Sequence, residues 1–495
     1  MHPNISSCCL RLLAVLGPKV LFPHTPAYNT SLSSYFTQQN AQLHPSCIVT
    51  PSNTADVSTI LNVLTSPSDD QNPTHTHASR NTNTNTNCPF AIRSGGHAYN
   101  IAFNNIASGI TIDLSSLNTI TLLRDQKTVS IGPGATWGAV YDILDPLNLS
   151  VPGGRAGQVG VGGLTLGGGI SYFSPRVGWT CDSVSEFEVV LADGEVVTAS
   201  QGHSTELWIS LCGGGTSNFG VVTRIDISTF PQGRIWGGFV YHALDTVPGQ
   251  LDAFEGFTAA ETYDEHASLI MSFAFSGGVG GAVVNSIVYT KEVEEEYPAV
   301  YAPFFELPSL SSNVRVASLG EIAKDQGSFS PDGRRQLSAV ITHTSTKPML
   351  AATYNNWNAS LASIETIPGI VWSMALDPLP PSFYARHADT NSMGLPNAPD
   401  GEPLVIAQLT ASWDNEGDDE TVERAARALI EGIERDAKEL NAFNPFLYLN
   451  YAADWQDPIA SYGEESVERL KKLSGEVDPR GVFRDGVKGF KIPGL

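Results

Sequence analysis

The sequence has no long apolar run, and basic residues are scarce. No stretch approaches the roughly 20 consecutive apolar residues that a membrane-spanning helix requires, so we expect no transmembrane segment. Lys and Arg number 28 against 51 Asp and Glu, which gives a formal net charge of −23. Nucleic acid and anionic lipid both need a basic surface on the protein that binds them. The charge balance therefore argues against nucleic-acid binding and against docking on anionic membranes.

Cysteine is also rare, and its distribution leaves the compartment open. Six cysteines in 495 residues are too few for a disulfide-rich scaffold. Cys47 and Cys88 flank a polar insert; they would pair with each other in an oxidising compartment or stay as reduced thiols. Sequons for N-glycosylation occur at Asn4, Asn29, Asn148 and Asn358. Such tripeptides often arise by chance, so they permit secretion without showing it.

Near the N-terminus, Leu10–Leu16 is apolar apart from Arg11. This run is short, lacks a preceding basic region and carries its arginine inside, so it does not fit a signal peptide. We expect a soluble protein, and the sequence leaves open whether it is secreted, vesicular or neither. The oligomeric state is equally open.

Residues 66–88 are polar and repetitive and show no periodicity. This composition predicts a disordered surface loop. His75 and His77 lie inside it. Histidines in a polar surface segment are more often solvated than metal-bound, so we expect no metal site.

Glycine is abundant, with 46 residues, which indicates tight turns or close approach of the backbone to a ligand. The length predicts about two to four domains. Short apolar runs separated by Gly or Asp predict a β-rich region up to residue 231. Its expected strands are Phe90–Ile92, Ile110–Leu114, Thr128–Ile131, Phe187–Leu191 and Val221–Ile227.

After residue 231 strand-like runs alternate with helical patterns. The expected strands are Ile235–Tyr241, Leu269–Phe275, Val283–Tyr289 and Leu404–Trp413. Apolar residues at spacings of three and four predict a helix over Asp419–Glu439. The last 55 residues predict a strand at Phe446–Tyr451, a helix at Glu464–Ser474 and a turn at 478–481. This order favours a discontinuous cofactor domain with a substrate domain inserted before its C-terminal return.

The first motif with chemical meaning is Arg93-Ser94-Gly95-Gly96-His97, directly after an expected strand. Small consecutive residues at this place form a tight loop whose N–H groups can converge on a diphosphate. A histidine at its end would lie beside the bound group. The alternative is a plain turn with a surface histidine.

The second motif is the segment Val159–Gly169, with the sequence VGVGGLTLGGG. It does not fit the dinucleotide fingerprint, because the third glycine of that pattern falls on Thr165. Its six glycines would be unfavourable in a helix interior and suit a backbone lying flat against a planar ligand. A third glycine loop, Gly213–Gly220, leads into a β-branched strand. Three such loops suggest a large cofactor held mainly by main chain.

In this order and spacing, the motifs resemble the flavin domain of the berberine-bridge-enzyme-like oxidases. These are FAD-linked oxidoreductases of the vanillyl-alcohol-oxidase or PCMH-type superfamily, and the chain resembles their fungal-type subgroup. Tyr448-Leu449-Asn450-Tyr451 and the turn from Asp478 to Phe483 resemble the end of the same family.

The resemblance implies an α+β fold: a PCMH-type FAD-binding domain of two α/β subdomains, with an inserted substrate domain of antiparallel sheet and helices. The expected boundaries are an N-terminal segment at 1–43, the FAD domain at 44–231, the substrate domain at 232–440 and the C-terminal return at 441–495.

The implied cofactor is FAD with a single covalent link, from His97 to the 8α-methyl carbon. Some relatives add a second link through a cysteine, but the corresponding position here is Ala156. The expected cofactor-binding residues are Arg93, Ser94, Gly95, Gly96, His97, Val159, Gly160, Gly162, Gly163, Gly167, Gly168, Gly169, Gly220, Val221, Val222 and Asn450. Cys212 replaces an arginine common in relatives, and we expect it to be a buried structural thiol.

Three residues are expected to be catalytic. By resemblance, Tyr448 or Tyr451 supplies the base, provided that its neighbours lower the pKa from about 10. On a strand the two would point to opposite faces, so only one would reach the flavin. Val159 is implied to lie beside the flavin carbon that reacts with O₂. The alternative to a catalytic role is that both tyrosines pack in the core. For Val159 the alternative is that it only occupies a position in the turn.

The expected function is an FAD-dependent oxidase that moves a hydride from a small alcohol, phenol or amine, such as a secondary metabolite, to FAD and then to O₂. The alternatives are a carbohydrate oxidase of the same family, a flavin protein that steers a cyclisation without net redox change, and an inactive flavin-binding glycoprotein. The expected partners are a small-molecule substrate and O₂.

Overall fold

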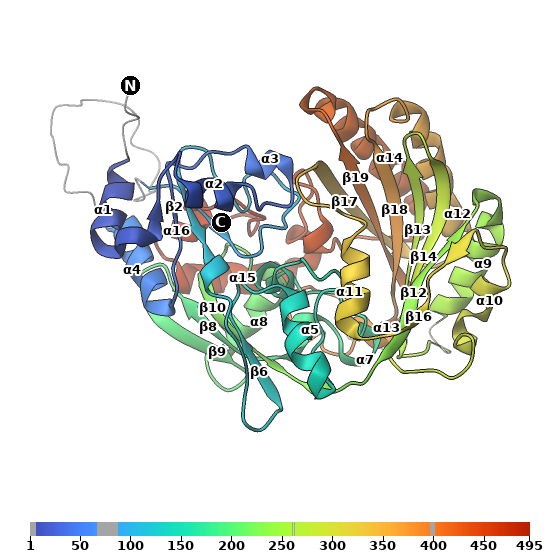
Figure 1. Ribbon diagram of the computed structural model, residues 1–495, viewed down its shortest axis with the longest axis horizontal. Coiled ribbons are helices and arrows are strands. Elements are labelled where there is room, and N and C mark those ends of the chain that lie inside the picture. Colours follow the sequence, from blue (N-terminus) through green and yellow to red (C-terminus); the bar gives the residue numbers. More distant parts are fainter. Residues whose placement is uncertain (1–5, 67–87, 260, 262, 397–400) are drawn as a thin grey trace.

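The chain folds into two parts that lie side by side (Figure 1). The computed structural model describes residues 6–66, 88–259, 261, 263–396 and 401–495. One part contains two small sheets with helices and a two-stranded pair of β7 (Leu149–Ser150) and β11 (Phe230–Pro231), and the other contains a large antiparallel sheet with helices on one face. This is the predicted α+β fold. The predicted loop at 66–88 and its two histidines lie almost wholly outside the described residues, as does Asn4.

The first small sheet has the strand order β1-β2-β4-β3. Its strands are β1 Val20–Leu21, β2 Cys47–Val49, β4 Ile110–Asp113 and β3 Phe90–Arg93. Strands β2 and β3 both pair in parallel with β4. Helices α1 (Ser7–Leu16) and α4 (Thr54–Thr65) bury their apolar sides in the same core as these strands. The N-terminal segment before residue 44 is therefore part of this body.

The second small sheet is antiparallel, with the order β5-β6-β10-β8-β9. Its strands are β5 Ile120–Leu122, β6 Thr128–Ile131, β10 Val221–Ser228, β8 Val184–Val190 and β9 Val196–Ser200. Helices α5 (Trp137–Leu144) and α8 (Thr205–Gly214) share its core. The chain between β6 and β10 thus carries both later glycine motifs.

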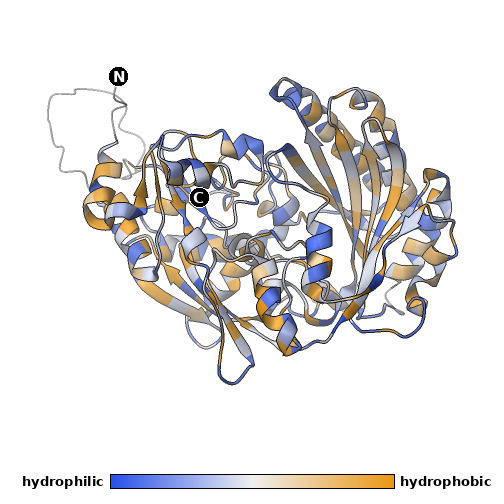
Figure 2. Ribbon diagram, in the orientation of Figure 1, coloured by the Kyte–Doolittle hydropathy of each residue, from blue (hydrophilic) through white to orange (hydrophobic). Residues whose placement is uncertain are grey.

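The large sheet has nine strands, and all of its strand pairs are antiparallel. The strands are β12 Ile235–His242, β13 Ala267–Ser276, β14 Gly280–Tyr289, β15 Ser311–Ser312, β16 Arg315–Ala317, β17 Arg335–Thr344, β18 Val371–Leu379, β19 Leu404–Trp413 and β20 Phe443–Asn444. Figure 2 shows apolar and polar residues mixed along them.

Helices cover one face of this sheet and leave the other facing the first part (Figure 1). The covering helices are α9 Val247–Thr258, α10 Ala302–Phe305, α12 Lys347–Ser360 and α14 Asp419–Glu439. The prediction of a helix over Asp419–Glu439 is confirmed. Its apolar stripe, which includes Val422 and Ile433, is buried among strand residues in one core.

The C-terminal segment returns to the first part of the molecule. Helix α15 (Glu464–Val477) confirms the predicted helix and packs on α8, and α16 (Val482–Gly486) joins the core of the first sheet. The predicted strand at Phe446–Tyr451 is wrong. The strand is only β20, and a 3-10 turn, η9, follows at Leu449–Tyr451.

All six cysteines form disulfides: Cys8–Cys88, Cys9–Cys47 and Cys181–Cys212. The predicted alternatives for Cys47 and Cys88, a mutual bond or free thiols, are both wrong, because each pairs with a cysteine of α1. The prediction that Cys212 is a buried free thiol is also wrong, because Cys212 is bonded to Cys181. Within the described residues, no helix is both long and apolar enough to cross a membrane.

Candidate functional site

A cavity of about 480 Å³ lies between the glycine loops and the open face of the large sheet. Most of its wall comes from three groups of segments that are far apart in the sequence. The glycine loops supply residues 94–100 and parts of 155–170 and 215–222, the large sheet supplies β12, β13, β14, β18 and β19, and the C-terminal turn supplies residues 448–452.

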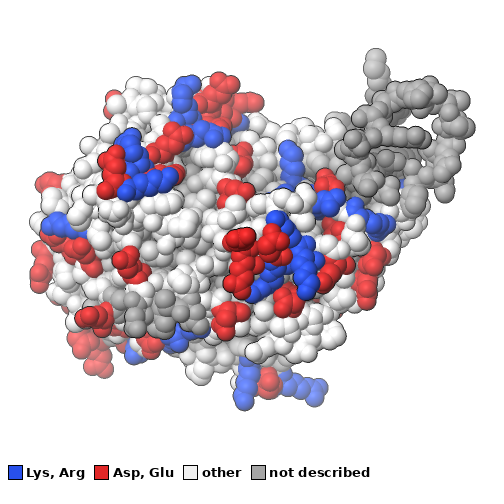
Figure 3. Space-filling model, turned by 180° about the vertical axis from the view of Figure 1, so that it is seen from behind, with Lys and Arg blue, Asp and Glu red and all other residues white. Residues whose placement is uncertain are grey.

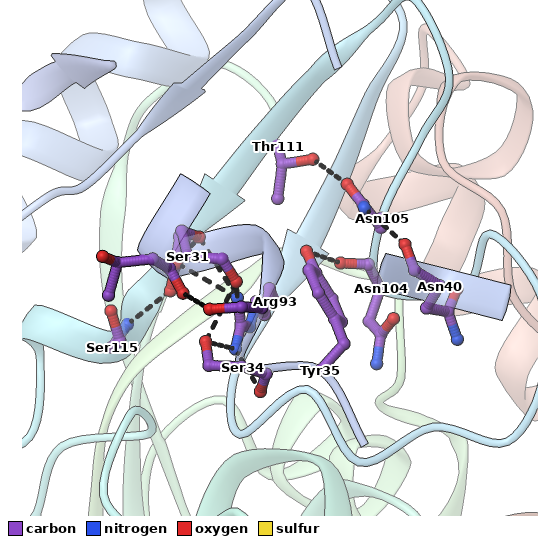
Figure 4. A network of polar contacts seen from close by, with 12 residues as sticks. Ser31, Ser34, Tyr35, Asn40, Arg93, Asn104, Asn105, Thr111 and Ser115 are labelled. Atoms are coloured by element: carbon purple, nitrogen blue, oxygen red, sulfur yellow. Dashed lines mark hydrogen bonds and ion pairs between the residues drawn. The ribbon is translucent and has the colours of Figure 1, made fainter. Parts of the chain in front are cut away.

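Arg93 does not line this cavity, which corrects its predicted role in cofactor binding. Its buried guanidinium donates hydrogen bonds to the carbonyl oxygens of Ser31 (2.7 Å) and Ser34 (2.8 Å) and forms an ion pair with Asp113 at 3.5 Å (Figure 4). It also lies over the Tyr35 ring, 3.9 Å from its centroid. Arg93 therefore fastens the N-terminal segment to the base of the first glycine loop.

The rest of that loop, Ser94 to His97, lines the cavity. Gly95 meets the second glycine loop, because a Cβ added to it would lie 2.5 Å from the Cα of Gly160. Gly96 has a φ of +71°, a left-handed conformation that favours glycine. These two glycines let the loops touch and turn the chain so that His97 reaches the cavity.

His97 stacks on Phe36, with ring centroids 3.8 Å apart and planes at 19°. Burial lowers the pKa of its imidazole to about 4. The ring is therefore neutral at physiological pH, and a neutral imidazole has a lone pair available for bonding. The stacking contact fixes the ring plane.

Four predicted residues of the second loop, Val159, Gly160, Gly162 and Gly163, line the cavity. Gly163 lies in the short helix α6 (Val161–Leu166), and a Cβ on it would meet no protein atom within 4 Å. A glycine inside a helix with open space beside it is unfavourable for the protein alone. The space suits a ligand that lies against the helix backbone.

Gly167, Gly168 and Gly169 do not line the cavity, which corrects their predicted role as a surface for the cofactor. A Cβ on Gly168 would lie 2.8 Å from the sulfur of Met393, and one on Gly169 would lie 2.5 Å from Cβ of Thr180. Gly168 and Gly169 also have φ values of +105° and +92°. They are glycines because protein packs closely on them.

The third loop lines the cavity through residues that include the predicted Gly220, Val221 and Val222. Nearby, the hydroxyl oxygen of Thr216 and the side-chain oxygen of Asn104 are buried without a hydrogen-bond partner in the described chain. Buried polar atoms normally have a partner. These two oxygens lie in the cavity wall, so a polar ligand can satisfy them.

These observations fit a bound flavin nucleotide. The loops leave open space at Gly163, buried polar oxygens lack partners in the wall, and His97 presents a neutral imidazole. Ser94–His97, Val159–Gly163 and Gly220–Val222 are the residues that would hold it.

The 3-10 turn η9 brings Tyr448 and Tyr451 together. Residues three apart lie above one another in a 3-10 helix, and the two rings meet edge to face with centroids 4.8 Å apart. Both line the cavity. The expectation that they point to opposite faces is therefore wrong, because it assumed a strand.

Tyr448 is held by the second glycine loop. Its hydroxyl oxygen accepts hydrogen bonds from the Gly169 N–H at 3.1 Å and from Asn450 Nδ2 at 3.0 Å. Its ring stacks on Trp179. Burial raises its pKa to about 12, although the Asn450 hydrogen bond and the Arg155 charge act to lower it. Asn450 also lines the cavity and donates to the Leu164 carbonyl.

Tyr451 belongs to a buried charged group. Arg155 donates a hydrogen bond to its hydroxyl at 2.6 Å and pairs with Asp377 of β18 at 2.6 Å. Burial raises the pKa of Tyr451; the Arg155 charge lowers it and the Asp377 charge raises it. All three side chains line the cavity. The condition that neighbours lower the pKa of the base is therefore not met, because the pKa values of both Tyr448 and Tyr451 are raised. The hydrogen bond from Arg155 is the contact that favours the phenolate form of Tyr451.

The sequence interpretation missed Arg155 and Asp377. Asp377 was detectable as an acidic residue inside the apolar run VWSMALDPL, since carboxylates are rarely buried without a partner. Arg155 had no comparable signal, because it lies in a glycine-rich connection and its partners are 222 and 296 residues away.

The fold and the site define a flavoprotein oxidoreductase, and comparisons with known proteins agree. A family described as "FAD binding domain" matches residues 77–200. The FAD-dependent monooxygenase sdcF of Emericella nidulans is 36% identical over 495 residues, covering 98% of each chain. A protein of Diaporthe leptostromiformis named oligopeptidase PhomG' is 39% identical over 487 residues, 97% of this chain but only 37% of that protein.

Solved structures share the fold. Berberine bridge enzyme from Eschscholzia californica has a TM-score of 0.75 at 18% identity, covering 98% of this chain and 99% of that one. 6-Hydroxy-D-nicotine oxidase from Arthrobacter nicotinovorans has a TM-score of 0.75 at 19% identity, covering 96% and 97%. The chain belongs to the family of FAD-dependent oxidoreductases that includes sdcF, and it shares its fold with berberine bridge enzyme.

Proposed function

We propose that the protein is an FAD-dependent oxidase that removes a hydride from a carbon bearing a hydroxyl group, or from a phenol activated by loss of its proton, in fungal-type secondary metabolism. The observation that carries this proposal is the Tyr451–Arg155–Asp377 group in the wall of the cavity that the glycine loops also line. It places a base that can be charged beside the expected position of a flavin.

The flavin, when bound, supplies a hydride acceptor. Tyr451 accepts the proton of the substrate hydroxyl, so the substrate loses one proton and one hydride in total. Arg155 stabilises the negative charge on the Tyr451 oxygen that does this. Asp377 holds Arg155 in place through the ion pair.

Tyr448 has a different role in this proposal. Its hydroxyl is engaged with a backbone N–H and with Asn450, and only 1% of its surface is exposed. Its hydroxyl therefore holds the second glycine loop through the N–H of Gly169. Tyr451 is more open to the cavity, and its partner carries a full positive charge.

The test compares Tyr451→Phe with Tyr448→Phe, because each keeps its ring and loses only the hydroxyl. We expect the first to slow anaerobic flavin reduction by about 10²–10⁴ and the second to have a much smaller effect. Because burial raises its pKa, Tyr451 stays protonated at neutral pH, and its deprotonated, active form becomes abundant only at alkaline pH. Wild-type reduction should therefore speed up through the alkaline range, and Tyr451→Phe should lose this dependence. Equal, unchanged rates in both variants would refute the assignment.

The name of the sdcF relative supports a second candidate, a monooxygenase that places one oxygen atom of O₂ in the product. The two functions differ in the fate of oxygen. An oxidase releases hydrogen peroxide in amounts equal to product and leaves ¹⁸O from ¹⁸O₂ out of the product. A monooxygenase transfers one labelled atom, which mass spectrometry detects.

The disulfides support a place in the secretory pathway or outside the cell. Three disulfides that use all six cysteines are typical of oxidising compartments. The sequon asparagines Asn29, Asn148 and Asn358 are exposed. N-glycans at these positions would shift the mass of the native protein on enzymatic deglycosylation, and an unchanged mass would remove this support.

A further inference from the structure

The open face of the large sheet carries a group of small side chains on β13, β18 and β19. On β18, Trp372 and Met374 point into the helix-covered core and are fully buried. Ser373 and Ala375 alternate with them and line the cavity. Successive strand residues point to opposite faces of the sheet. The large side chains of β18 therefore lie on the helix-covered face, and its small side chains leave space for a ligand on the other face.

Strand register makes the small residues neighbours. Ser272 of β13 lies opposite Ala375, and Ala274 lies opposite Ser373. Ser373 in turn lies opposite Thr410 of β19. We call these five residues the shelf: Ser272, Ala274, Ser373, Ala375 and Thr410. All five line the cavity and are partly exposed, so they form a floor of small side chains, with Gln408 paired beside Ala375.

The shelf offers hydrogen bonds without charge. The hydroxyls of Ser272, Ser373 and Thr410 make no hydrogen bond within the described part of the chain. Elsewhere around the cavity, by contrast, Ser286 donates to Gln326 at 2.8 Å. Hydroxyls that face a cavity without a partner are suited to hydroxyl or carbonyl groups of a ligand.

The cavity wall carries no net charge. Among the described residues that line it, Arg155 and Asp377 are the only ones with a charged side chain at neutral pH, and they neutralise each other at 2.6 Å. The pKa of His97 is far below neutrality. A charged substrate would therefore enter without a counter-ion, and burial of an unpaired charge is costly.

Aromatic rings stand at the edge of the shelf. Phe239 and Phe329 both line the cavity, with ring centroids 4.5 Å apart. They supply apolar contact for a ring lying on the floor.

We propose that the substrate is an uncharged, hydroxylated ring compound that lies on the shelf, and that the neutral wall, in which the charges of Arg155 and Asp377 cancel, makes the site reject charged analogues. This rests on the proposed function, and it narrows the substrate class of that function by excluding ammonium and carboxylate substrates. A phenolic ring and a sugar share this chemistry, and the test separates them.

The first test measures binding to the oxidised holoenzyme through the change in flavin absorption at pH 7. The probes are 2-naphthol, 2-naphthoate and 2-naphthylmethylammonium, which have the same ring and differ in charge. We expect 2-naphthol to bind, and both charged probes to bind at least about 30-fold more weakly. Cellobiose is the sugar probe. If 2-naphthol binds more tightly than cellobiose, the ring of the substrate is phenolic; if cellobiose binds more tightly, the ring is that of a sugar.

Failure of both neutral probes, or tighter binding of either charged probe, would overturn the proposal. This readout needs no turnover. If the probes bind as expected and no substrate reduces the flavin, the proposed oxidase function fails while the inference about the shelf stands.

Charge variants test the role of the ion pair. Asp377→Asn leaves Arg155 unpaired, so the affinity for 2-naphthoate should rise at least about tenfold relative to 2-naphthol. The double variant Arg155→Gln/Asp377→Asn is the matched control, because it restores neutrality and should keep the wild-type preference. An unchanged ratio in folded, flavin-containing Asp377→Asn would contradict the role of the pair.

A size variant tests the floor. Ala375→Leu should weaken 2-naphthol binding at least about tenfold by filling the shelf, with flavin content unchanged. Ser412→Leu is the control, because Ser412 follows Thr410 on the same face of β19 but lies outside the cavity. Equal effects of the two substitutions would place the ligand elsewhere.

Discussion

At the scale of single residues, His97 illustrates how environment prepares a side chain for bonding. Its ring is held against Phe36, and burial keeps it unprotonated. The chain also lacks a second attachment point, because Ala156 lines the cavity where some relatives carry a cysteine. Both features support one covalent link to FAD, through His97.

We expect wild-type protein that is denatured and precipitated to stay yellow, and His97→Ala to release its flavin under the same treatment. The native variant should keep most of its fold, because His97 forms no hydrogen bond in the described chain that the fold would lose. Absorption of the pellet and supernatant provides the measurement, and circular dichroism monitors folding. Release of flavin from the wild type would contradict the covalent link.

Val159 is the second residue with a specific expectation. Its backbone is fixed at both ends, by an N–H bond to Ala156 (3.2 Å) and a carbonyl that accepts from Trp137 (3.0 Å). Its side chain faces the cavity. Adding a methylene at a fixed position that faces the cavity should obstruct O₂, which needs only a passage.

We expect Val159→Leu to slow reoxidation of the reduced flavin by air about tenfold, which corresponds to about 1.4 kcal/mol of steric cost. Reduction by substrate should change little. Stopped-flow reoxidation of both proteins, with hydrogen peroxide counted against product, provides the measurement. If the flavin of the wild-type protein stays reduced in air, the hypothesis that the protein is an oxidase is wrong.

At the scale of elements, the Cys181–Cys212 disulfide connects two segments that position the cofactor loops. Cys212 ends the helical part of α8, directly before the third glycine loop. Cys181 lies in the 3-10 turn η4 (Thr180–Ser183), whose Thr180 packs against Gly169. The bond therefore ties the second glycine loop to the third.

We expect Cys181→Ala/Cys212→Ala to destabilise this body by about 3–4 kcal/mol, the loop-closure value for a sequence separation of 31 residues. Flavin should dissociate or change its visible circular dichroism before global unfolding. Cys9→Ala/Cys47→Ala is the control, because its bond lies in the core of the first sheet. An identical flavin signal in both double variants would contradict a specific link to the loops.

At the scale of the whole molecule, the cavity exists because two bodies meet. The glycine loops come from one and the shelf from the other, and the C-terminal turn inserts its tyrosines between them. Figure 3 shows acidic and basic groups gathered in mixed clusters, which are divided by broad uncharged areas. The formal net charge of −23 nevertheless repels itself across the molecule.

Raising NaCl from about 10 to about 300 mM should therefore increase the Tm, because the screening length falls from about 30 Å to below about 10 Å. Each kcal/mol of repulsion removed raises the Tm by about 2–4 °C in domains of this size. KCl at the same concentrations should act equally if screening is the cause. A constant or falling Tm would show that the charges are already balanced locally.

Much of the fold was predictable because its signals are local. The Asp419–Glu439 helix follows from apolar spacing alone, and the order of the glycine motifs identifies the family before any contact is known. His97 was a candidate for the same reason: the loop that carries it is encoded in five consecutive residues, and in the structure it lines the cavity.

Pairings between distant segments were not predictable. Cys47 and Cys88 each bond to α1, which a count of cysteines cannot reveal. Gly167–Gly169 have the same composition as the glycines that line the cavity, yet they contact protein. The difference lies in which neighbour arrives from elsewhere in the chain.

The sequence by itself determined the family, the cofactor loops and the residues available for chemistry, because each depends on residues close together in the chain. Only the tertiary structure decided that Tyr448 and Tyr451 share one side, that Arg155 bonds both Tyr451 and Asp377, and that a floor of small residues faces them. These arrangements depend on a 3-10 turn in place of a strand and on contacts across more than 200 residues. Packing between distant segments determines the turn and these contacts, and no local sequence pattern predicts such packing.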